Sequence, residues 1–394
     1  MKTAVIGGGA AGFFLAINLK EMCPEMEVTI FEQGTRVLRK VEVSGGGRCN
    51  CTNAFASVRD LQAVYPRGHR LMKRLFCTFD YRDSYRWFEQ HGVRLVTQED
   101  ECVFPASQDA HTIINCFLSE ARRHGITIRT GARIETLGQL DGYDYIAVTT
   151  GGMSRAPLFD MPPSLFISPV PSLFTFRIDD TALQALMGTV VEQASAAIPG
   201  TKLRAEGPLL ITHWGMSGPA ILRLSSYAAR LLADSAYKLP LAVNWTHHKE
   251  AEVAEELLGA IRRYPQRQLS SVRPFALPGR LWSYLTEKAL GQRAQSPWGS
   301  LNRKELNRLT NTLCNDGYQI AGRAPFKDEF VTCGGVSLSA VNPNTLEAKA
   351  TPGLYFAGEV LDIDGVTGGF NFQAAWTTAY TVAKAISATA VAHQ

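Results

Sequence analysis

The sequence has few of the features that mark membrane or secreted proteins. In its 394 residues no apolar stretch approaches the roughly 20 residues of a membrane span. The N-terminus leads directly into an apolar segment, without the charged, apolar and small-residue regions of a signal peptide. We therefore expect a cytoplasmic protein with no membrane partner.

The cysteines form neither a C-x-x-C pair nor a pattern with metal-ligand spacing. They stand at positions 23, 49, 51, 77, 102, 116, 314 and 333. Cys49 and Cys51 are close together, but no matching His or Cys pair stands nearby. We expect no metal site, and mostly buried, unreactive thiols in a reducing compartment.

The overall charge gives no argument for a nucleic-acid partner. The formal net charge is +4, whereas nucleic-acid binding calls for a basic patch rather than a mild excess. The run Arg262-Arg263-Tyr264-Pro265-Gln266-Arg267 is the one basic candidate, and such a run is usually a solvated helix face. Hydrophobic residues make up 45% and charged residues 19%, which is typical of a soluble globular protein with a large core.

A dinucleotide-binding motif opens the chain. The apolar segment Thr3–Ile6 is followed by the glycine-rich turn Gly7-Gly8-Gly9-Ala10-Ala11-Gly12 and by a helical run over 13–20. Gly7, Gly9 and Gly12 fit G-x-G-x-x-G, in which the glycines permit a tight turn, approach to a pyrophosphate and close helix–strand packing. The helix N-terminus then offers free N–H groups to the phosphates. A second strand over 27–31 ends at Glu32, where an acid should accept the hydroxyls of the adenosine ribose.

Two further glycine-rich segments extend this site. In SGGGRCNCTN at 44–53, three glycines expose backbone N–H groups, and Arg48 and Asn50 can hydrogen-bond a heteroaromatic ring or a phosphate. The pair Gly151-Gly152 ends an apolar strand, where the chain can cross over a dinucleotide. The alternatives are a flexible loop at 44–53 and an ordinary strand end at 151.

A late segment indicates that the dinucleotide is a flavin. The strand in GLYFAGE at 353–359 delivers Glu359 to the sheet edge, where its carboxylate can accept hydrogen bonds from a ribityl chain. Gly368 and Gly369 then open the last helix, whose N-terminal dipole favours the negative charge of a reduced flavin. The alternative is a surface acidic turn before a terminal helix, which does not predict this cluster of glycines.

The order of expected elements divides the chain into three parts. Helices and strands alternate up to about residue 165, strands dominate from about 168, and residues 249–313 have a helical period. We predict an FAD-binding domain over 1–165 and 331–394, a β-rich insertion over 166–247 and 313–330, and a helical insertion over 248–312. The strand near 354–357 should lie beside the strand at 3–6 in a discontinuous sheet.

The chain resembles a family of bacterial FAD-dependent oxidoreductases that includes aminoacetone-oxidase-like proteins and bile-acid-inducible flavoproteins. The strings that carry the resemblance are SGGGRCNCTN at 44–53, GPLLITHWGMSGPAILRLS at 207–225, VTCGGV at 331–336 and GLYFAGEVLDIDGVTGGFNFQAAW at 353–376. The resemblance implies an α/β fold: a glutathione-reductase-type Rossmann domain with non-covalent FAD, a β-barrel-like insertion and a helical insertion. Leu38 stands where the family usually has Gly, and Cys51 where it often has Leu.

Motif and resemblance together assign the cofactor-binding residues. The glycine turn would hold the pyrophosphate, Glu32 the ribose, Glu359 the ribityl chain, and the start of the last helix the pyrimidine edge of the flavin. The full set is Gly7, Gly9, Ala10, Ala11, Gly12, Glu32, Gln33, Lys40, Ser44, Gly47, Arg48, Cys49, Asn50, Ala132, Arg133, Thr150, Gly151, Gly358, Glu359, Asn371, Phe372 and Gln373.

A flavin makes the protein an oxidoreductase, acting on a small organic substrate by hydride transfer. Arg48 and His213 are the candidate catalytic residues, lining a cleft between the 44–53 loop and the 213–217 turn. The alternative for His213 is a residue that caps the turn at 217–218. NAD(P)H is a candidate electron donor, although no second G-x-G-x-x-G with a following acid is present. A flavin-dependent RNA-modifying enzyme and a non-enzymatic flavin-binding redox sensor remain alternatives, and the sequence does not separate an oxidase from a reductase.

Overall fold

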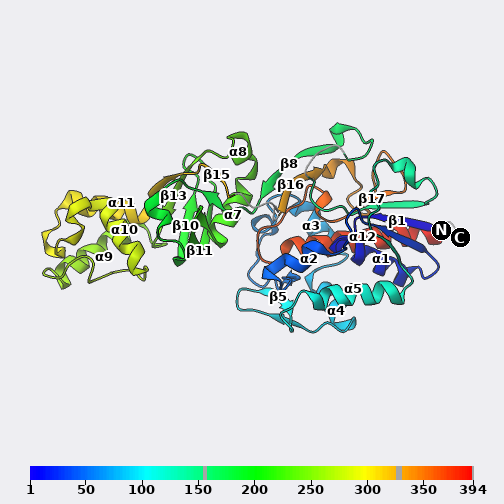
Figure 1. Ribbon diagram of the computed structural model, residues 1–394, viewed down its shortest axis with the longest axis horizontal. Helices are drawn as coiled ribbons and strands as arrows, with labels where there is room; N and C mark the ends of the chain where they lie inside the picture. The colour runs from blue at the N-terminus through cyan, green and yellow to red at the C-terminus, as the bar shows by residue number, and fades with distance from the viewer. Residues whose placement is uncertain (154–157, 325–330, 393–394) are drawn as a thin grey trace. The chain divides into compact units, whose positions relative to one another are not determined.

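The computed structural model describes residues 1–153, 158–324 and 331–392, so the expected end of the β-rich insertion at 330 lies outside the described residues (Figure 1). The chain divides into two compact units. Unit 1 comprises Met1–Val170 and Val331–Gln394, and unit 2 comprises Pro171–Phe330. None of the helices in the described part of the chain combines the length and apolar character that a membrane span requires.

A five-stranded parallel sheet forms the centre of unit 1. Its strand order is β17-β7-β1-β2-β6, with β1 (Lys2–Ile6), β2 (Glu27–Phe31), β6 (Thr127–Arg129), β7 (Tyr145–Val148) and β17 (Leu354–Phe356). β1 and β2 are buried except at their first residues, as expected for strands covered on both faces. The late strand β17 therefore joins the sheet of the N-terminal strands, which makes this sheet discontinuous in sequence.

The expected position of the late strand within the sheet is wrong. β17 pairs with β7, from Leu354 opposite Ile146 to Phe356 opposite Val148. β7 in turn pairs with β1, so one strand separates β17 from β1. β7 lies between β17 and β1 in the sheet. The glycine positions and the alternation of strands and helices in the sequence do not indicate whether β7 or β17 is the direct neighbour of β1.

Helices rich in small and aromatic residues cover this sheet. α1 (Ala10–Met22) packs against α12 (Phe370–Ala392) and α5 (His111–Arg123). The Phe14 ring lies 5.1 Å from the ring of Trp376 and 4.6 Å from that of Trp87. This aromatic cluster fixes α1 against the C-terminal helix, and so ties the two ends of the chain into one core.

The remaining elements of unit 1 lie around this core. They are α2 (Arg39–Val43), α3 (His69–Leu75), α4 (Tyr81–Gln90), a three-stranded sheet of β3 (Thr52–Asn53), β5 (Cys102–Pro105) and β4 (Leu95–Thr97), and the pair β8 (Phe166–Ser172) and β16 (Val331–Val336). Between Leu75 and Tyr81 the chain leaves the helical conformation, so α3 and α4 are separate helices. Asp80 starts the second one, because its side chain accepts from the N–H groups of Arg82 and Asp83 in a capping box.

Unit 2 contains a seven-stranded antiparallel sheet with helices around it. The strand order is β14-β13-β10-β11-β12-β9-β15. The strands are β9 (Phe176–Arg177), β10 (Val190–Ala197), β11 (Arg204–Thr212), β12 (Gly215–Ser217), β13 (Pro240–Asn244), β14 (Asp316–Gln319) and β15 (Gly322–Arg323). The helices are α6 (Thr181–Gln184), α7 (Pro219–Tyr227), α8 (Ala229–Asp234), α9 (Glu250–Arg263), α10 (Gly279–Leu290) and α11 (Arg303–Cys314). Buried residues of the sheet, of α9–α11 and of the segments that join them form one core, which includes Trp245, Trp282 and Trp298.

Candidate cofactor-binding site

The glycine motif that spans the end of β1 and the start of α1 leaves no space for a side chain at Gly7 or Gly12. Gly7 has a φ of +116°, and a Cβ there would lie 2.4 Å from the carbonyl oxygen of Thr149. A Cβ on Gly12 would lie 2.0 Å from the carbonyl oxygen of Gly7. These two residues therefore have to be glycine for α1 to pack this closely on the sheet.

Gly9 has the opposite environment. A Cβ at Gly9 would meet no atom of the described residues within 4 Å. Gly9 is the N-cap of α1, and within the described chain no side chain caps this helix and no acidic residue stands in its first turn. The N-terminal N–H groups and their partial positive charge are thus open to an anion, which fits a pyrophosphate.

Glu32 connects the end of β2 to this turn. Its Oε2 accepts from the Gly8 N–H at 2.9 Å and its Oε1 from the Gly34 N–H at 2.7 Å. The carboxylate is only partly buried, so its remaining lone pairs can accept hydroxyl donors such as those of a ribose. The neighbouring segment is also anchored here, because the Ala132 N–H donates to the Glu32 carbonyl, while Gln33 and Arg133 are exposed.

The 44–53 loop has an unusual backbone and several anchors. Gly45, Gly46 and Gly47 all have positive φ, and so does the buried Cys49 at +59°. The Ser44 carbonyl accepts from the N–H groups of Gly47 and Cys49, and the Ser44 hydroxyl donates to Val41. The three consecutive glycines thus turn their backbone in a way that residues with a side chain rarely adopt.

Arg48 is held by an aromatic ring. Its guanidinium lies 4.3 Å from the ring centre of Phe104, and its Nη1 donates to Gln108 at 3.3 Å. The side chain is half-buried. A guanidinium that stays protonated and is fixed in this way provides a permanent positive charge beside the glycine loop.

Asn50 brings the same loop to the start of α12. With its amide nitrogen toward the carbonyls of Val103 and Thr52, it donates to both, and its oxygen accepts from the Gly369 N–H at 3.2 Å. A Cβ on Gly369 would lie 2.2 Å from the Thr52 carbonyl oxygen. The glycine loop and the N-terminus of the last helix are therefore adjacent, as a shared ligand would require.

Glu359 links three segments that are far apart in sequence. Its Oε2 lies 3.1 Å from Lys40 Nζ, and its Oε1 accepts from the Thr332 N–H at 2.8 Å. The preceding Gly358 has a φ of +81°, and a Cβ there would lie 2.9 Å from the Cβ of Ala11. Gly151, which follows β7, also lies near this carboxylate, since a Cβ placed on Gly151 would be 3.8 Å from Glu359 Oε2. The neighbouring Thr150 is exposed.

The side chains of Asn371 and Gln373 are used within the protein. Asn371 both accepts from and donates to the backbone of Gly365. Gln373 is fully buried, accepts from the Thr52 hydroxyl at 2.6 Å and donates to Thr377. Phe372 stacks on Trp376 with 5.4 Å between ring centres. The Gln373 N–H also donates within the protein, to the Gly369 carbonyl at 3.0 Å. A flavin contact from these two residues would therefore come from the Asn371 backbone N–H, and the contacts expected of Asn371 and Gln373 stay a prediction.

His213 belongs to unit 2, whereas the other predicted site residues belong to unit 1. It stands with Trp214 in the two-residue turn between β11 and β12, exposed, with its ring 4.8 Å from that of Trp214. Its place opposite Arg48 in a substrate cleft therefore stays a prediction.

Several residues that shape the site carry no signal in the sequence. Thr149 donates to the carbonyls of Ile6 and Gly7 and so holds the glycine turn. Phe104 and Gln108 position Arg48, and Thr332 positions Glu359. All of them reach the site from other segments, so local motifs do not reveal them.

Two family models match the chain. Residues 1–158 match the HI0933-like protein Rossmann domain, and residues 170–331 match the HI0933-like protein barrel and H2TH domain. The expected combination of a Rossmann-type FAD domain with a barrel-like and helical insertion is thereby confirmed.

Curated relatives match over nearly the whole chain. Ribosomal RNA dihydrouridine synthase of Escherichia coli (strain K12) is 28% identical, over 96% of this chain and 96% of that protein. 3-dehydro-bile acid delta(4,6)-reductase of Clostridium scindens is 26% identical, over 98% of this chain and 98% of that protein. A solved structure of 3-ketosteroid delta1-dehydrogenase from Sterolibacterium denitrificans is 9% identical with a TM-score of 0.49, and covers 98% of this chain and 99% of that one.

The family models and the curated relatives confirm that the chain is an FAD-dependent oxidoreductase and that it resembles a bile-acid reductase, as expected. The resemblance to aminoacetone oxidase stays an expectation. So does the use of NAD(P)H.

Proposed function

We propose that this protein reduces a carbon–carbon double bond conjugated to a carbonyl group. The premise is that the chain carries both domains of the HI0933-like proteins. The supporting observation is the chemistry that the names of its relatives share. Dihydrouridine is uridine with a saturated C5–C6 bond, and a delta(4,6)-reductase acts on double bonds of a 3-oxo steroid. In both cases the carbonyl oxygen can take up the negative charge that develops when hydride adds to the double bond.

The residues of unit 1 fit FAD. The uncapped start of α1 with its open Gly9 suits the pyrophosphate, and Glu32 and Glu359 offer carboxylate oxygens for the ribose and the ribityl chain. Bound FAD in its reduced form would supply the hydride, and the oxidised form would then accept a new hydride from the electron donor.

Two side chains would act on the substrate. The reduction adds a hydride to one carbon and a proton to its neighbour. Arg48, held against Phe104, would bind the carbonyl oxygen and stabilise its developing charge. His213, exposed on its turn, is the candidate proton donor.

The electron donor would be a nicotinamide. NAD(P)H would have to bind on the substrate side of the flavin, because the sequence has no second dinucleotide fingerprint. Rapid anaerobic reduction of the flavin by NADH or NADPH would support a reductase. No reduction by either would favour an oxidase or a redox sensor.

The test is a half-reaction under anaerobic conditions. FAD-loaded protein, chemically reduced, is mixed with a 3-oxo steroid that has conjugated double bonds, with unmodified ribosomal RNA, or with the saturated steroid as a matched control. The proposal predicts flavin reoxidation with at least one unsaturated substrate and a product heavier by two hydrogens. Reoxidation by neither substrate beyond the rate seen with the control would contradict it.

RNA is the second candidate substrate, favoured by the charge distribution of unit 2. Residues 262–308 contain ten Lys and Arg but only two Glu, so the rest of the chain carries a net charge of −4. All ten basic residues are exposed, and one of them, Lys288, pairs with the buried Asp316 at 2.6 Å. Glu305, one of the two acids, is buried and paired with Arg293 at 2.7 Å. A local concentration of basic residues of this kind is what nucleic-acid binding calls for, and it supports RNA as the second candidate.

A salt titration separates this candidate from a small-molecule reductase. If RNA binds here, the logarithm of its affinity should fall steeply and linearly with the logarithm of the salt concentration. Replacing Arg262 and Arg267 by Glu should weaken binding and flatten that slope, whereas reversing Arg36 in unit 1 should leave both unchanged. Weak, salt-independent binding by the wild-type protein would leave the expectation of no nucleic-acid partner in place.

A further inference from the structure

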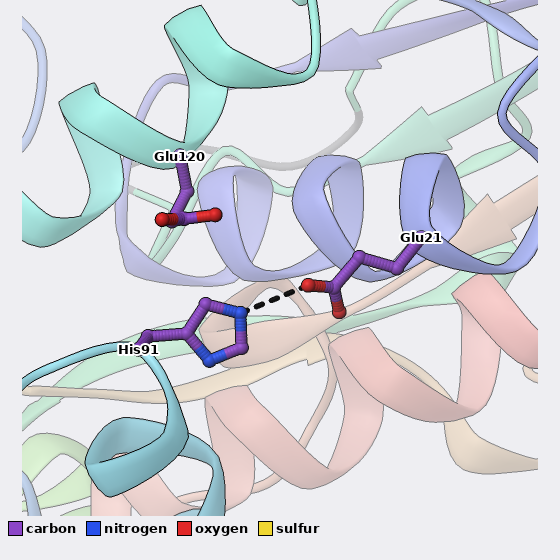
Figure 2. Close-up of side chains that lie close together, drawn as sticks. All are labelled: Glu21, His91 and Glu120. Carbon is purple, nitrogen blue, oxygen red and sulfur yellow. Dashed lines mark hydrogen bonds and ion pairs between the residues drawn. The ribbon is translucent and has the colours of Figure 1, made fainter.

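Two glutamates and two histidines face one another in unit 1, outside the residues assigned to the cofactor. Glu21 lies in the last turn of α1, Glu120 in the last turn of α5, and His91 and His124 directly follow α4 and α5. Figure 2 shows the carboxylates of Glu21 and Glu120 and the imidazole of His91 directed toward a common region. One ligand atom from each of these three residues lies within 4.8 Å of the other two.

The distances between these atoms approach those of ligands on one metal ion. His124 Nε2 lies 3.7 Å from Glu21 Oε1 and 3.6 Å from Glu120 Oε2, and His91 Nε2 lies 2.9 Å from Glu21 Oε1. Two ligands on a tetrahedral Zn²⁺, with bonds of about 2.0–2.1 Å, lie roughly 3.3–3.4 Å apart. His124 Nε2 therefore lies close to both carboxylates of the group formed by Glu21, His91 and Glu120.

Two of these atoms are buried without a hydrogen-bond partner among the described residues. They are Glu120 Oε2 and His124 Nε2, and Glu120 is only 8% exposed. Arg123 lies 3.3 Å from Glu120 Oε2 as an ion pair, but its own side chain is 65% exposed. Buried polar atoms without a hydrogen bond are unusual and costly. A cation between the carboxylate and the imidazole would satisfy both.

The orientation of His91 points to the same region. Its Nδ1 lies 2.7 Å from the Trp87 carbonyl oxygen and therefore carries a proton, and its ring stacks on the Trp87 indole at 3.8 Å. Its Nε2 lies 2.9 Å from Glu21 Oε1, where the protonated ring donates to the carboxylate. A bound cation would take the place of that proton and be held by the Nε2 lone pair and the carboxylate. A carbonyl that fixes the tautomer in this way is the usual second partner of a metal-binding histidine.

We propose that Glu21, His91, Glu120 and His124 form a binding site for a divalent transition-metal ion, for which Zn²⁺ is the best match. Imidazole nitrogens and carboxylate oxygens are a ligand set that zinc uses in proteins, and two carboxylates balance the charge of the ion. Four protein ligands leave no open position, so the site is structural. It would join the ends of α1, α4 and α5 in the cofactor domain.

The experiment measures zinc binding by FAD-loaded protein that carries no polyhistidine tag. After treatment with a chelator, the wild-type protein, His91→Gln and Glu120→Gln are titrated with Zn²⁺ by calorimetry, and bound metal is counted by elemental analysis. His248→Gln is the matched control, because His248 also pairs with a glutamate, Glu252 at 3.5 Å, but is exposed on unit 2.

We expect one Zn²⁺ per chain in the wild-type protein and in His248→Gln. Affinity should fall in His91→Gln and Glu120→Gln by more than the roughly 10- to 100-fold that follows loss of a second-shell partner. Zinc X-ray absorption should show nitrogen and oxygen at about 2.0–2.1 Å with imidazole scattering, and no sulfur at about 2.3 Å.

Three results would overturn the site. The first is a wild-type protein without stoichiometric zinc, which is expected if His91 and Glu21 form only a protonated ion pair. The second is equal zinc affinity in the folded variants and the wild type. The third is a sulfur shell in the absorption spectrum, which would place the ion on cysteines. If a variant fails to fold by circular dichroism, the wild-type stoichiometry and absorption spectrum still decide.

Discussion

Lys40 and Glu359 are 319 residues apart in sequence, and their side chains meet at 3.1 Å. Lys40 belongs to α2, which follows strand β2 of the parallel sheet, and Glu359 follows β17, the last strand of that sheet. The pair joins the N-terminal and C-terminal parts of the FAD domain beside the predicted cofactor residues.

Breaking this pair should affect the cofactor more than the fold. Lys40→Met should change the free energy of unfolding by no more than about 1 kcal/mol, because the Lys40 side chain is 62% exposed. Glu359→Ala should lower the free energy of unfolding by about 1–3 kcal/mol more than Lys40→Met does, because it also leaves the Thr332 N–H without its acceptor. Denaturant unfolding of the FAD-free protein measures stability, and flavin fluorescence measures FAD affinity, which we expect to fall in both variants. Unchanged FAD affinity in Glu359→Ala would remove Glu359 from the site.

Alanine substitutions at Gly9 and Gly12 should distinguish an effect on FAD binding from an effect on folding. Gly12→Ala places a Cβ 2.0 Å from the Gly7 carbonyl oxygen, so the variant should fold poorly or lose the α1 packing. Gly9→Ala meets no described atom within 4 Å and should fold normally, but its methyl group would project into the space of the pyrophosphate. Gly138→Ala, also in open space without a positive φ, is the control. Thermal unfolding and FAD titration check this, and normal FAD affinity in Gly9→Ala would contradict the pyrophosphate assignment.

Glu32→Ala should weaken FAD binding by about 1–3 kcal/mol, the cost of losing hydrogen bonds to a charged acceptor. The variant also removes the acceptor of the Gly8 and Gly34 N–H groups, so its stability should be measured separately. Glu32→Gln keeps one acceptor oxygen and should lose less affinity. Titration of FAD-free protein with FAD gives the numbers, with the exposed Glu25→Ala as control.

The parts of the fold that follow local sequence rules were predictable. The glycine turn, its flanking strand and helix, and Glu32 are close in sequence, and each has a steric or electrostatic reason for its residue type. The partners that hold the site were not predictable, since Phe104, Thr149 and Thr332 reach it through tertiary packing. The same holds for strand order, where β7 separates β17 from β1. It also holds for the cluster around His91, whose residues lie in or directly after α1, α4 and α5.

Leu38 illustrates a departure whose consequence only the structure reveals. It stands where the resembling family usually has Gly, and its φ is +59°, a conformation that costs a leucine free energy. Its side chain is buried, and its N–H donates to the Gly8 carbonyl. Burial of the leucine side chain offsets the backbone strain beside the dinucleotide turn.

The cysteines should differ sharply in reactivity. Cys77 is exposed, whereas Cys49, Cys51, Cys102, Cys116 and Cys333 are buried. Burial, with a smaller contribution from Glu120, raises the pKa of the Cys116 thiol to about 12, so only about one Cys116 in a thousand is a thiolate at pH 9. Burial likewise raises the pKa of Cys51, and Cys49 adds to the effect. Alkylation of the native protein, followed by mass spectrometry, should label Cys77 first and the buried thiols only after unfolding. Labelling of Cys116 at the rate of Cys77 would show that α5 opens in solution.

Arg48 should matter for turnover more than for cofactor retention. Arg48→Met keeps an unbranched side chain over the Phe104 ring but removes the positive charge and the hydrogen bond to Gln108. FAD should remain bound through the glycine turn and Glu32, while the rate of flavin reoxidation by an unsaturated substrate should fall by about 100-fold or more, the scale for losing one donor to a developing oxyanion. Arg48→Lys should recover part of the rate, because it restores the charge without the planar donor fork. The exposed Arg39→Met is the control. Stopped-flow measurement of the half-reaction decides: an unchanged rate in Arg48→Met with full FAD occupancy would exclude Arg48 from the chemistry, and loss of FAD would assign it to cofactor binding alone.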